Sequence, residues 1–240
     1  MGSAVDVLNE DDITTRQQPF LSDLLRDIPG LDVNRSGPNG AFTQVRMRGA
    51  EANHTLIIID GIEVGDPFNA GEFEFAHLLS AGVYQVEVVR GPQSALWGSD
   101  AIGGVINVQT DTGRLQDRKW AEGLLEGGSF GTFLSSAQTG AAGASGRVRA
   151  GIAYTDMRGI SASPIGTERD GYENLTATVG GTLYVSELLT LSASARYVDA
   201  MVEEDTQDFD FLSPAQGLVI DAETTRGSER LYARGAGRLE

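Results

Sequence analysis

The sequence predicts an α+β domain followed by a series of antiparallel β-strands, and three observations support this division. Residues Val86 to Thr110 combine a strand, a one-turn helix and a second strand around closely spaced glycines. A continuous apolar run, Leu56 to Ile59, predicts a strand that is buried on both faces. After Thr110 the chain changes to long segments in which every second residue is apolar or glycine. That alternation is typical of strands with one apolar face.

Composition excludes several classes of protein. The 240 residues suffice for one large or two ordinary domains, and the absence of cysteine excludes disulfides, zinc–thiolate sites and thiol catalysis. A formal net charge of −16 argues against binding to nucleic acid, whose phosphates are also negative. No apolar run reaches the roughly 18–20 residues of a membrane-spanning helix. A transmembrane β-barrel remains open, because its signal lies in alternation.

The elements of the first domain follow from local patterns. Weak alternation predicts a strand over Ala4–Leu8, and Thr14 to Gln17 has the spacing of a helical capping box, with Pro19 opening the helix proper. The apolar side chains from Phe20 to Ile28 share one helical face, and Pro29-Gly30 ends it. Further predicted elements are a strand at Gln44–Arg48, a turn at Asp60-Gly61 and a short helix at Phe73–Leu79.

The stretch from Val86 to Thr110 contains closely spaced corners. Val86 and Val88 face one side of a strand, and Pro92 occupies the first position of a short helix that ends at Gly98. A second strand follows over residues Val105 to Val108. The glycines allow the tight corners between these elements.

Six alternating segments follow, at 121–128, 132–142, 148–154, 175–185, 189–197 and 231–239. Gly143–Gly146 and Ser186-Glu187 are predicted tight turns, whereas Asp156–Gly171 and Asp199–Ser228 are predicted long polar loops. Short turns at one end and long loops at the other are typical of an outer-membrane barrel. A soluble β-sandwich shows the same alternation, so both folds stay open on this pattern.

Four successive segments resemble a known family. Leu24–Leu31, Val45–Gly49, Thr55–Gly61 and Val86–Thr110 are similar, in this order, to the signatures of the plug domain of TonB-dependent outer-membrane receptors. The resemblance implies an α+β plug domain followed by antiparallel β-strands of an incomplete transmembrane β-barrel. The plug would span 4–110, a linker 111–118 and the first barrel strands 119–240. Six strands cannot close such a barrel, so the other strands, a signal peptide and the TonB-binding segment are expected outside this sequence.

The resemblance also implies a function. Receptors of this family sit in the outer membrane with the plug in the barrel lumen, and import a large scarce nutrient, here cobalamin-like or a ferric siderophore. The implied partners are the TonB energy-transducing protein, a cobalamin or iron-chelate ligand and outer-membrane lipid. The alternative is a soluble ligand-binding or interaction module with a β-sandwich. The apolar faces of Leu175–Val185 and Leu189–Tyr197 should discriminate, because only a barrel would turn them outward.

Within the family, Asp170-Gly171-Tyr172 and the acidic run Glu203–Asp210 resemble the vitamin B12 (cobalamin) branch, in which acidic outer loops hold calcium. Carboxylates are the ligands that calcium prefers. Arg169 departs from the paired aspartates of that branch, so a solvated acidic loop is the alternative interpretation. The calcium candidates are Asp170, Asp205, Asp208, Asp210 and Asp221.

An enzyme is not expected. The two histidines, His54 and His77, are predicted to be structural, and Gly91 to Ser94 lacks the spacing of a nucleophile elbow. Gly98 to Gly104 has the spacing of a phosphate loop, but Gly104 stands where such a loop has lysine. No catalytic residue is therefore predicted.

Two further groups of residues are candidates for function. The charges beside the plug strands are predicted to make polar contacts with each other or with the barrel wall, with ordinary surface charge as the alternative: Arg46, Arg48, Asp60, Glu87 and Arg90. Amide and aromatic side chains in loops predicted to face outward are the candidate ligand contacts: Asn39, Phe68, Asn69 and Phe73.

Overall fold

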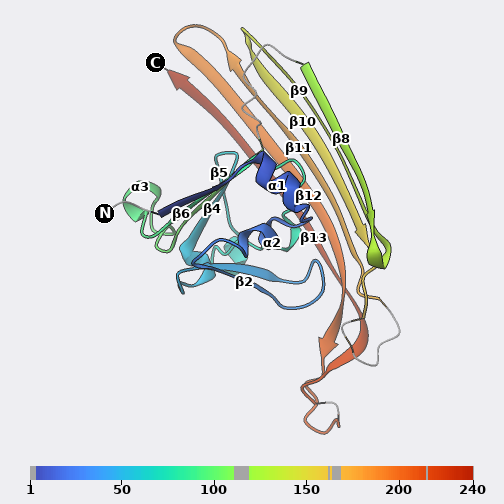
Figure 1. The fold of residues 1–240 in the computed structure, drawn as a ribbon. Coiled ribbons are helices and arrows are strands. Elements are labelled where there is room, and N and C mark those ends of the chain that lie inside the picture. Colours follow the sequence, from blue (N-terminus) through green and yellow to red (C-terminus); the bar gives the residue numbers. More distant parts are fainter. Residues whose placement is uncertain (1–3, 111–118, 162, 164–168, 215, 240) are drawn as a thin grey trace.

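The computed structural model describes residues 4–110, 119–161, 163, 169–214 and 216–239, except the side chains of residues 221–223. The N-terminal domain lies against the concave side of a curved sheet that is formed by the second half of the chain (Figure 1). This arrangement places the contact between the two parts at the centre of the molecule.

A five-stranded sheet forms one side of the N-terminal domain, in the order β1-β6-β7-β4-β5. Its strands are β1 (Ala4–Leu8), β4 (Thr55–Ile59), β5 (Ile62–Val64), β6 (Gln85–Arg90) and β7 (Gly104–Gln109). All of β4 is buried, as its continuous apolar run predicts, and it pairs in parallel with β7. Val86 and Val88 are fully buried on one face of β6, so the predicted alternation is confirmed.

A hairpin and short helices complete the domain core. The hairpin is β2 (Leu31–Arg35) with β3 (Thr43–Met47), and the α-helices are α1 (Glu10–Arg16), α2 (Leu21–Leu25) and α3 (Ser94–Trp97). The single 3₁₀ turns are η1 (Ala52–His54), η2 (Pro67–Asn69) and η3 (Phe75–His77), with η4 (Ser129–Gly131) in the curved sheet. In the part of the chain that the structure describes, no helix is long and apolar enough to cross a membrane.

The predicted helix starts differ from the structure. The capping box is formed by Asn9 and Asp12, each accepting from the other's backbone N–H, and not by the segment that starts at Thr14. Three acidic residues in the first turn of α1 favour the earlier start through the helix dipole. Pro19 and Pro92 each precede the N-cap of the next helix, so neither opens one. The helix expected at Phe73–Leu79 is reduced to the turn η3.

The second half of the chain forms a six-stranded antiparallel sheet in sequence order, which confirms the six predicted segments. Its strands are β8 (Lys119–Gly128), β9 (Thr132–Gly143), β10 (Gly146–Met157), β11 (Tyr172–Tyr184), β12 (Leu189–Gln207) and β13 (Val219–Leu239). The sheet is open within the described residues, with β8 and β13 as its edges. Tight turns join β9 to β10 and β11 to β12, as predicted.

The loop predicted over Asp199–Ser228 is wrong in its extent. β12 and β13 stay paired from Leu189 and Leu239 to Gln207 and Val219, with one irregularity between Glu204 and Thr206. Polar side chains suggested a loop, but the backbone ladder does not require apolar residues. Ala200 and Val202 keep the period of two and are buried against the N-terminal domain.

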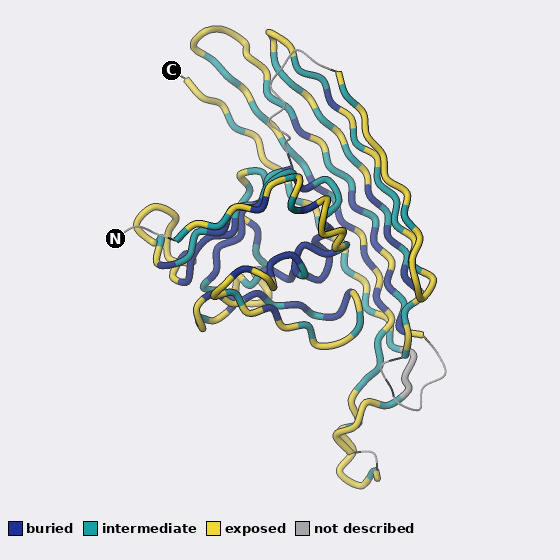
Figure 2. The backbone as a smooth tube through the Cα atoms, viewed as in Figure 1, coloured by how far each residue is buried: buried dark blue, intermediate teal, exposed yellow. Residues whose placement is uncertain are grey.

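The two faces of the curved sheet differ in polarity. The outward face carries exposed apolar side chains from successive strands: Val148, Ile152, Val179, Leu183, Leu191 and Leu231. The concave face carries polar side chains that are buried against the N-terminal domain, among them Asn174, Thr176 and Arg196. Buried and exposed positions therefore alternate along the strands (Figure 2). No second sheet covers the apolar face within the described ranges, so the sheet is built as a barrel wall and not as half of a sandwich.

Candidate functional site

The N-terminal domain contacts the concave face of the curved sheet through three clusters of polar and aromatic side chains. Each cluster joins a turn of the domain to a different set of strands. An apolar cluster lies in the same contact, where Phe20 and Leu79 of the domain pack with Met157, Ala200 and Val202 of the sheet.

The first cluster centres on Asp60, at the turn between β4 and β5. Asp60 takes a left-handed conformation with φ 51°, and Gly61 follows with φ 77°. Its carboxylate accepts hydrogen bonds from the Thr110 backbone N–H at 2.8 Å and from the Thr110 hydroxyl at 2.7 Å. Arg149 of β10 forms an ion pair with the same carboxylate at 2.8 Å and donates to the Thr110 hydroxyl. This cluster fixes the end of β7 to the sheet.

The second cluster centres on Glu74, which lies between the core residues Phe73 and Phe75 and is only 8% exposed. Arg230 of β13 approaches one carboxylate oxygen at 2.7 Å and Arg226 approaches the other at 3.2 Å. Arg226 also lies 3.4 Å from Glu204 and donates to the carbonyl of Gly40. One buried carboxylate thus holds two arginines of the edge strand.

The third cluster is aromatic and centres on Tyr172, at the start of β11. The Tyr172 ring packs against Phe20 at 5.4 Å and lies parallel to the His77 ring, with 5.9 Å between centroids. Asn174 donates to the Tyr172 hydroxyl at 2.9 Å and to the carbonyl of His77 at 3.4 Å. Burial lowers the pKa of His77 to about 4, an effect that nearby Glu74 partly opposes. His77 is therefore held neutral.

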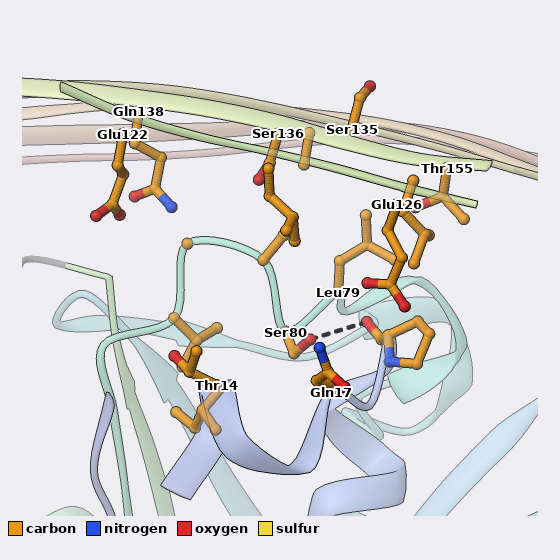
Figure 3. A pocket seen from close by; sticks show the side chains of 18 of the residues that line it. Thr14, Gln17, Leu79, Ser80, Glu122, Glu126, Ser135, Ser136, Gln138 and Thr155 are labelled. Atoms are coloured by element: carbon orange, nitrogen blue, oxygen red, sulfur yellow. Dashed lines mark hydrogen bonds between the residues drawn. The ribbon is translucent and has the colours of Figure 1, made fainter. Parts of the chain in front are cut away.

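A cavity of about 300 Å³, lined by both polar and apolar side chains, separates the domain from strands β8–β10. Figure 3 shows Glu122, Gln138 and Glu126 extending from the sheet toward the segment that contains Gln17 and Ser80. The Ser80 hydroxyl donates to the Pro19 carbonyl at 3.2 Å, and this hydrogen bond joins the segment after η3 to the segment before α2. The contact between the domain and the sheet is thus incomplete here.

Of the five charges predicted to make polar contacts, only Asp60 forms an ion pair with the curved sheet among the described residues. Arg90 pairs with Asp6 of β1 and donates to the carbonyl of Pro29, while Glu87 accepts from Gln85 and Asn107. Arg46 donates to Gln44, and Arg48 lies beside Gly91. These four side chains therefore belong to the interior of the N-terminal domain or to its own surface.

The four predicted ligand contacts are separated by the fold. Phe68 is fully exposed and Asn69 is exposed beside it on η2. Asn39 accepts from Arg35 at 2.8 Å, and its amide lies 3.2 Å from the Met157 sulfur at the end of β10. Phe73 is 8% exposed and packs edge-on against Phe75 at 4.9 Å. Its ring faces the domain core, so Phe73 does not present the aromatic surface that its loop position suggested.

The predicted calcium residues are spread over loops and strands: Asp170 follows β10, Asp205 lies near the end of β12, Asp208 and Asp210 lie in the loop after β12, and Asp221 lies in β13. Asp205 accepts from the Ser163 backbone N–H at 2.7 Å, and Asp208 accepts from the Asp210 N–H at 2.8 Å. Asp170 is buried at the start of the β11 segment, and the side chain of Asp221 lies outside the described residues. Among the described side chains, no three metal-ligating groups gather closely enough to hold a metal ion.

Sequence reasoning missed Glu74, Tyr172, Asn174 and the arginines that face them. Arg226, Arg230, Arg234 and Arg238 recur every fourth residue of one strand, and this spacing is the signal that could have indicated a common face. Glu74 offers a weaker signal, as a lone carboxylate in the apolar run around Phe75.

Comparisons with known proteins agree with this architecture. Residues 1–105 match the family described as TonB-dependent Receptor Plug Domain. The chain is 30% identical over 204 residues to the vitamin B12 transporter BtuB of Photobacterium profundum, covering 84% of this chain and 33% of that protein. It is 29% identical over 232 residues to the BtuB of Vibrio vulnificus, covering 95% and 37%.

Solved structures share the fold. A ferric enterobactin receptor of Pseudomonas aeruginosa (PfeA) superposes with a TM-score of 0.68 at 18% identity, over 98% of this chain and 39% of that one. The siderophore receptor PiuA of Acinetobacter baumannii gives 0.66 at 20% identity, over 85% and 27%. The chain thus spans about a third of the length of the curated relatives that it matches. A plug-domain match, an open wall of antiparallel strands and these relatives together show that the chain belongs to the TonB-dependent receptors.

Proposed function

We propose that this chain is the plug (residues 4–110), the linker (111–118) and the first wall strands (119–240) of an outer-membrane importer of a large, scarce nutrient. A cobalamin is the first candidate, because both curated relatives named above are vitamin B12 transporters. A ferric siderophore is the second, since receptors for such chelates share the fold.

The observation that carries the proposal is the division of polarity across the curved sheet. Apolar side chains such as Val179 and Leu183 point away from the plug, where lipid would meet them. Polar and charged side chains such as Asn174 and Arg196 point toward the plug. A wall with this polarity encloses a polar interior that a plug can block.

The polar clusters support a plug that is held and yet displaceable. Asp60–Arg149 and Glu74–Arg230 connect it to β10 and β13 at separate points. Ion pairs such as these lose less on separation when water replaces each partner than a buried apolar contact does. Force transmitted by the TonB energy-transducing protein would break them in turn, and the ligand would pass into the periplasm without any bond chemistry on the chain.

Capture is proposed at the loops on the end of the wall opposite the tight turns. Phe68 and Asn69 are exposed on the plug, and Asn39 lies beside the end of β10. Calcium bound by Asp170, Asp205, Asp208, Asp210 and Asp221 would order the wall loops, since carboxylate oxygens suit that cation. The loop containing Asp208 and Asp210 is already folded by its own Asx turns.

Uptake by the full-length receptor that carries this chain tests the proposal. The receptor is expressed in a Gram-negative strain that lacks its own cobalamin and siderophore receptors, with and without TonB. We expect TonB-dependent uptake of labelled cyanocobalamin, or of a ferric siderophore if the second candidate is correct. Chelation of calcium should weaken binding to the de-energised receptor. Failure to take up either ligand class, or equal uptake without TonB, would contradict the proposal.

A further inference from the structure

A second, larger cavity lies between the plug sheet and the end of the wall that carries the tight turns. Its volume is about 1020 Å³, within the range of sites for organic ligands. The wall contributes four arginines to its lining and the plug contributes two carboxylates: Arg147, Arg149, Arg234, Arg238, Asp60 and Glu63. Trp97 and Trp120 add aromatic surface. The lining therefore carries more positive than negative charge.

The carboxylate of Asp60 does not neutralise this excess. It is already engaged by Arg149 and by two hydrogen bonds from Thr110. Within the described part of the chain, neither Arg234 nor Arg238 forms an ion pair, and the Arg234 guanidinium lies over Gly61, which offers no charge. Two cationic groups of the lining are thus without a described anionic partner.

Arg196 of β12 lies two residues from the cavity-lining Ser194 but does not itself line the cavity. It is 4% exposed, and it interacts electrostatically with Asp60 of the plug. Its charge therefore has a partner on the plug. Among the described residues, the arginines that line the cavity without an anionic partner are Arg234 and Arg238.

The arginines of β13 extend this positive surface along the wall. Arg226, Arg230, Arg234 and Arg238 share the concave face at intervals of four residues. The first two bind Glu74 of the plug, whereas the last two face the inner cavity. An anion that leaves the level of Glu74 would meet cationic groups from there to the tight-turn end.

We propose that this inner cavity is a transit site for an oxyanion, a phosphate or carboxylate group carried by the imported molecule, bound chiefly by Arg234 and Arg238. The planar guanidinium group suits bidentate contact with such groups. The proposal rests on the import function proposed above, which it deepens by naming the chemistry of the cargo.

Anion binding is tested first, without reference to transport. Thermal unfolding of the purified full-length receptor is followed in sodium phosphate and in sodium chloride of equal ionic strength. We expect phosphate to raise the Tm of the wild type by a few degrees, because a ligand that binds only the folded state stabilises it. The double variant R234Q/R238Q should lose this rise, and R230Q, on the same strand but bound to Glu74, should keep it. For each protein, the Tm in phosphate is compared with the Tm of the same protein in chloride, so a variant with a lower Tm can still be judged.

An identical rise of Tm in phosphate in all three proteins, or no rise in the wild type, would overturn the site.

A second experiment separates the binding of free phosphate from the binding of an oxyanion on the imported molecule. In energised cells, uptake divided by surface-bound ligand should fall about tenfold in R234Q/R238Q for an anionic ligand, in line with the loss of a charge-assisted hydrogen bond. Uptake of a neutral ligand should not change. If the ratio of uptake to surface-bound ligand is the same in the double variant and the wild type for the anionic ligand, the transit role is wrong even if phosphate binds. If the wild type takes up neither ligand, the proposed import function is wrong instead.

Discussion

Arg149 on the wall binds Asp60 on the plug at 2.8 Å, and the same carboxylate receives both the backbone N–H and the hydroxyl of Thr110. Three parts of the chain meet there: the β4–β5 turn, the end of β7 and the middle of the wall. Because Thr110 directly follows β7, this cluster fixes the C-terminal end of that strand to the wall.

Asp60→Asn should weaken the contact between the plug and the wall at this cluster. The substitution keeps the shape but removes the charge from a pair whose side chains are 12% and 13% exposed. We expect the free energy of unfolding of the full-length receptor to fall by about 1–3 kcal/mol in denaturant titrations. Glu63→Gln, an exposed position on the same hairpin, is the control. Equal stability of the two variants would show that the Asp60–Arg149 pair contributes nothing.

The Glu74–Arg230 pair should show direct energetic coupling. A double-mutant cycle with Glu74→Gln and Arg230→Gln is expected to give a coupling energy of about 0.5–3 kcal/mol, since the groups are in contact at 2.7 Å. The matched cycle replaces Arg230→Gln by Arg238→Gln, on the same strand and face but away from Glu74. That cycle should give no coupling. Similar values from both cycles would mean that the effect is a general response to lost positive charge.

Acid should destabilise the plug through His77. The folded-state pKa, about 4, lies below the ordinary value of 6.5, so protons bind more tightly to the unfolded chain. The stability contributed by neutral His77 is complete above pH 6.5 and is lost as the pH falls toward 4, by about 3 kcal/mol in total. Unfolding of the receptor from pH 7.5 to 3.5 measures this loss. His77→Gln should flatten the profile in that window and His54→Gln should not. A profile that His77→Gln leaves unchanged would assign the acid sensitivity to other groups.

Local patterns predicted the backbone of the plug better than its contacts. The run Leu56–Ile59 and the alternation of Val86 and Val88 depend on neighbouring residues, and both strands formed where expected. Likewise α3 ends at Gly98, whose φ is 88°, and this end could be predicted because glycine adopts positive φ readily. These features are encoded within a few residues, and sequence reasoning can therefore find them.

The plug–wall contacts could not be read in the same way. Arg226 and Arg230 are 152 and 156 residues away from Glu74, and no local pattern pairs them. Most of the charges predicted to make polar contacts lie on the plug strands, whereas the ion pairs with the wall are made by Asp60 and Glu74, which lie in turns of the plug. Arg46 lies on the face of β3 opposite to the buried Val45 and Met47, and it donates to Gln44 of the same strand.

Gly40 should be intolerant of any side chain because it lies against Tyr172. A Cβ at Gly40 would collide with the Tyr172 ring, which is 2% exposed, and the φ of Gly40 is +86°. Gly49 has a similar φ of +75° but nothing within 4 Å, so Gly49→Ala reports the conformational cost alone, about 1–2 kcal/mol. We expect Gly40→Ala to lower stability by about 1–3 kcal/mol more. Equal losses of Tm would mean that the Tyr172 ring can move aside.

A charged side chain on the outward face of the wall should destabilise the receptor in a lipid bilayer. Val179 is half-exposed on β11 and points away from the plug, between strands that present Ile152 and Leu191 to the same side. In a barrel, Val179→Arg should cost up to about 2–4 kcal/mol, depending on its depth in the bilayer, when the full-length receptor folds into phosphatidylcholine vesicles. Val179→Leu should fold like the wild type, and Glu187→Arg, in the tight turn after β11, should have little effect. Folding of Val179→Arg with wild-type stability would mean that this face does not contact lipid, and the soluble alternative would then have to explain six strands with an uncovered apolar face.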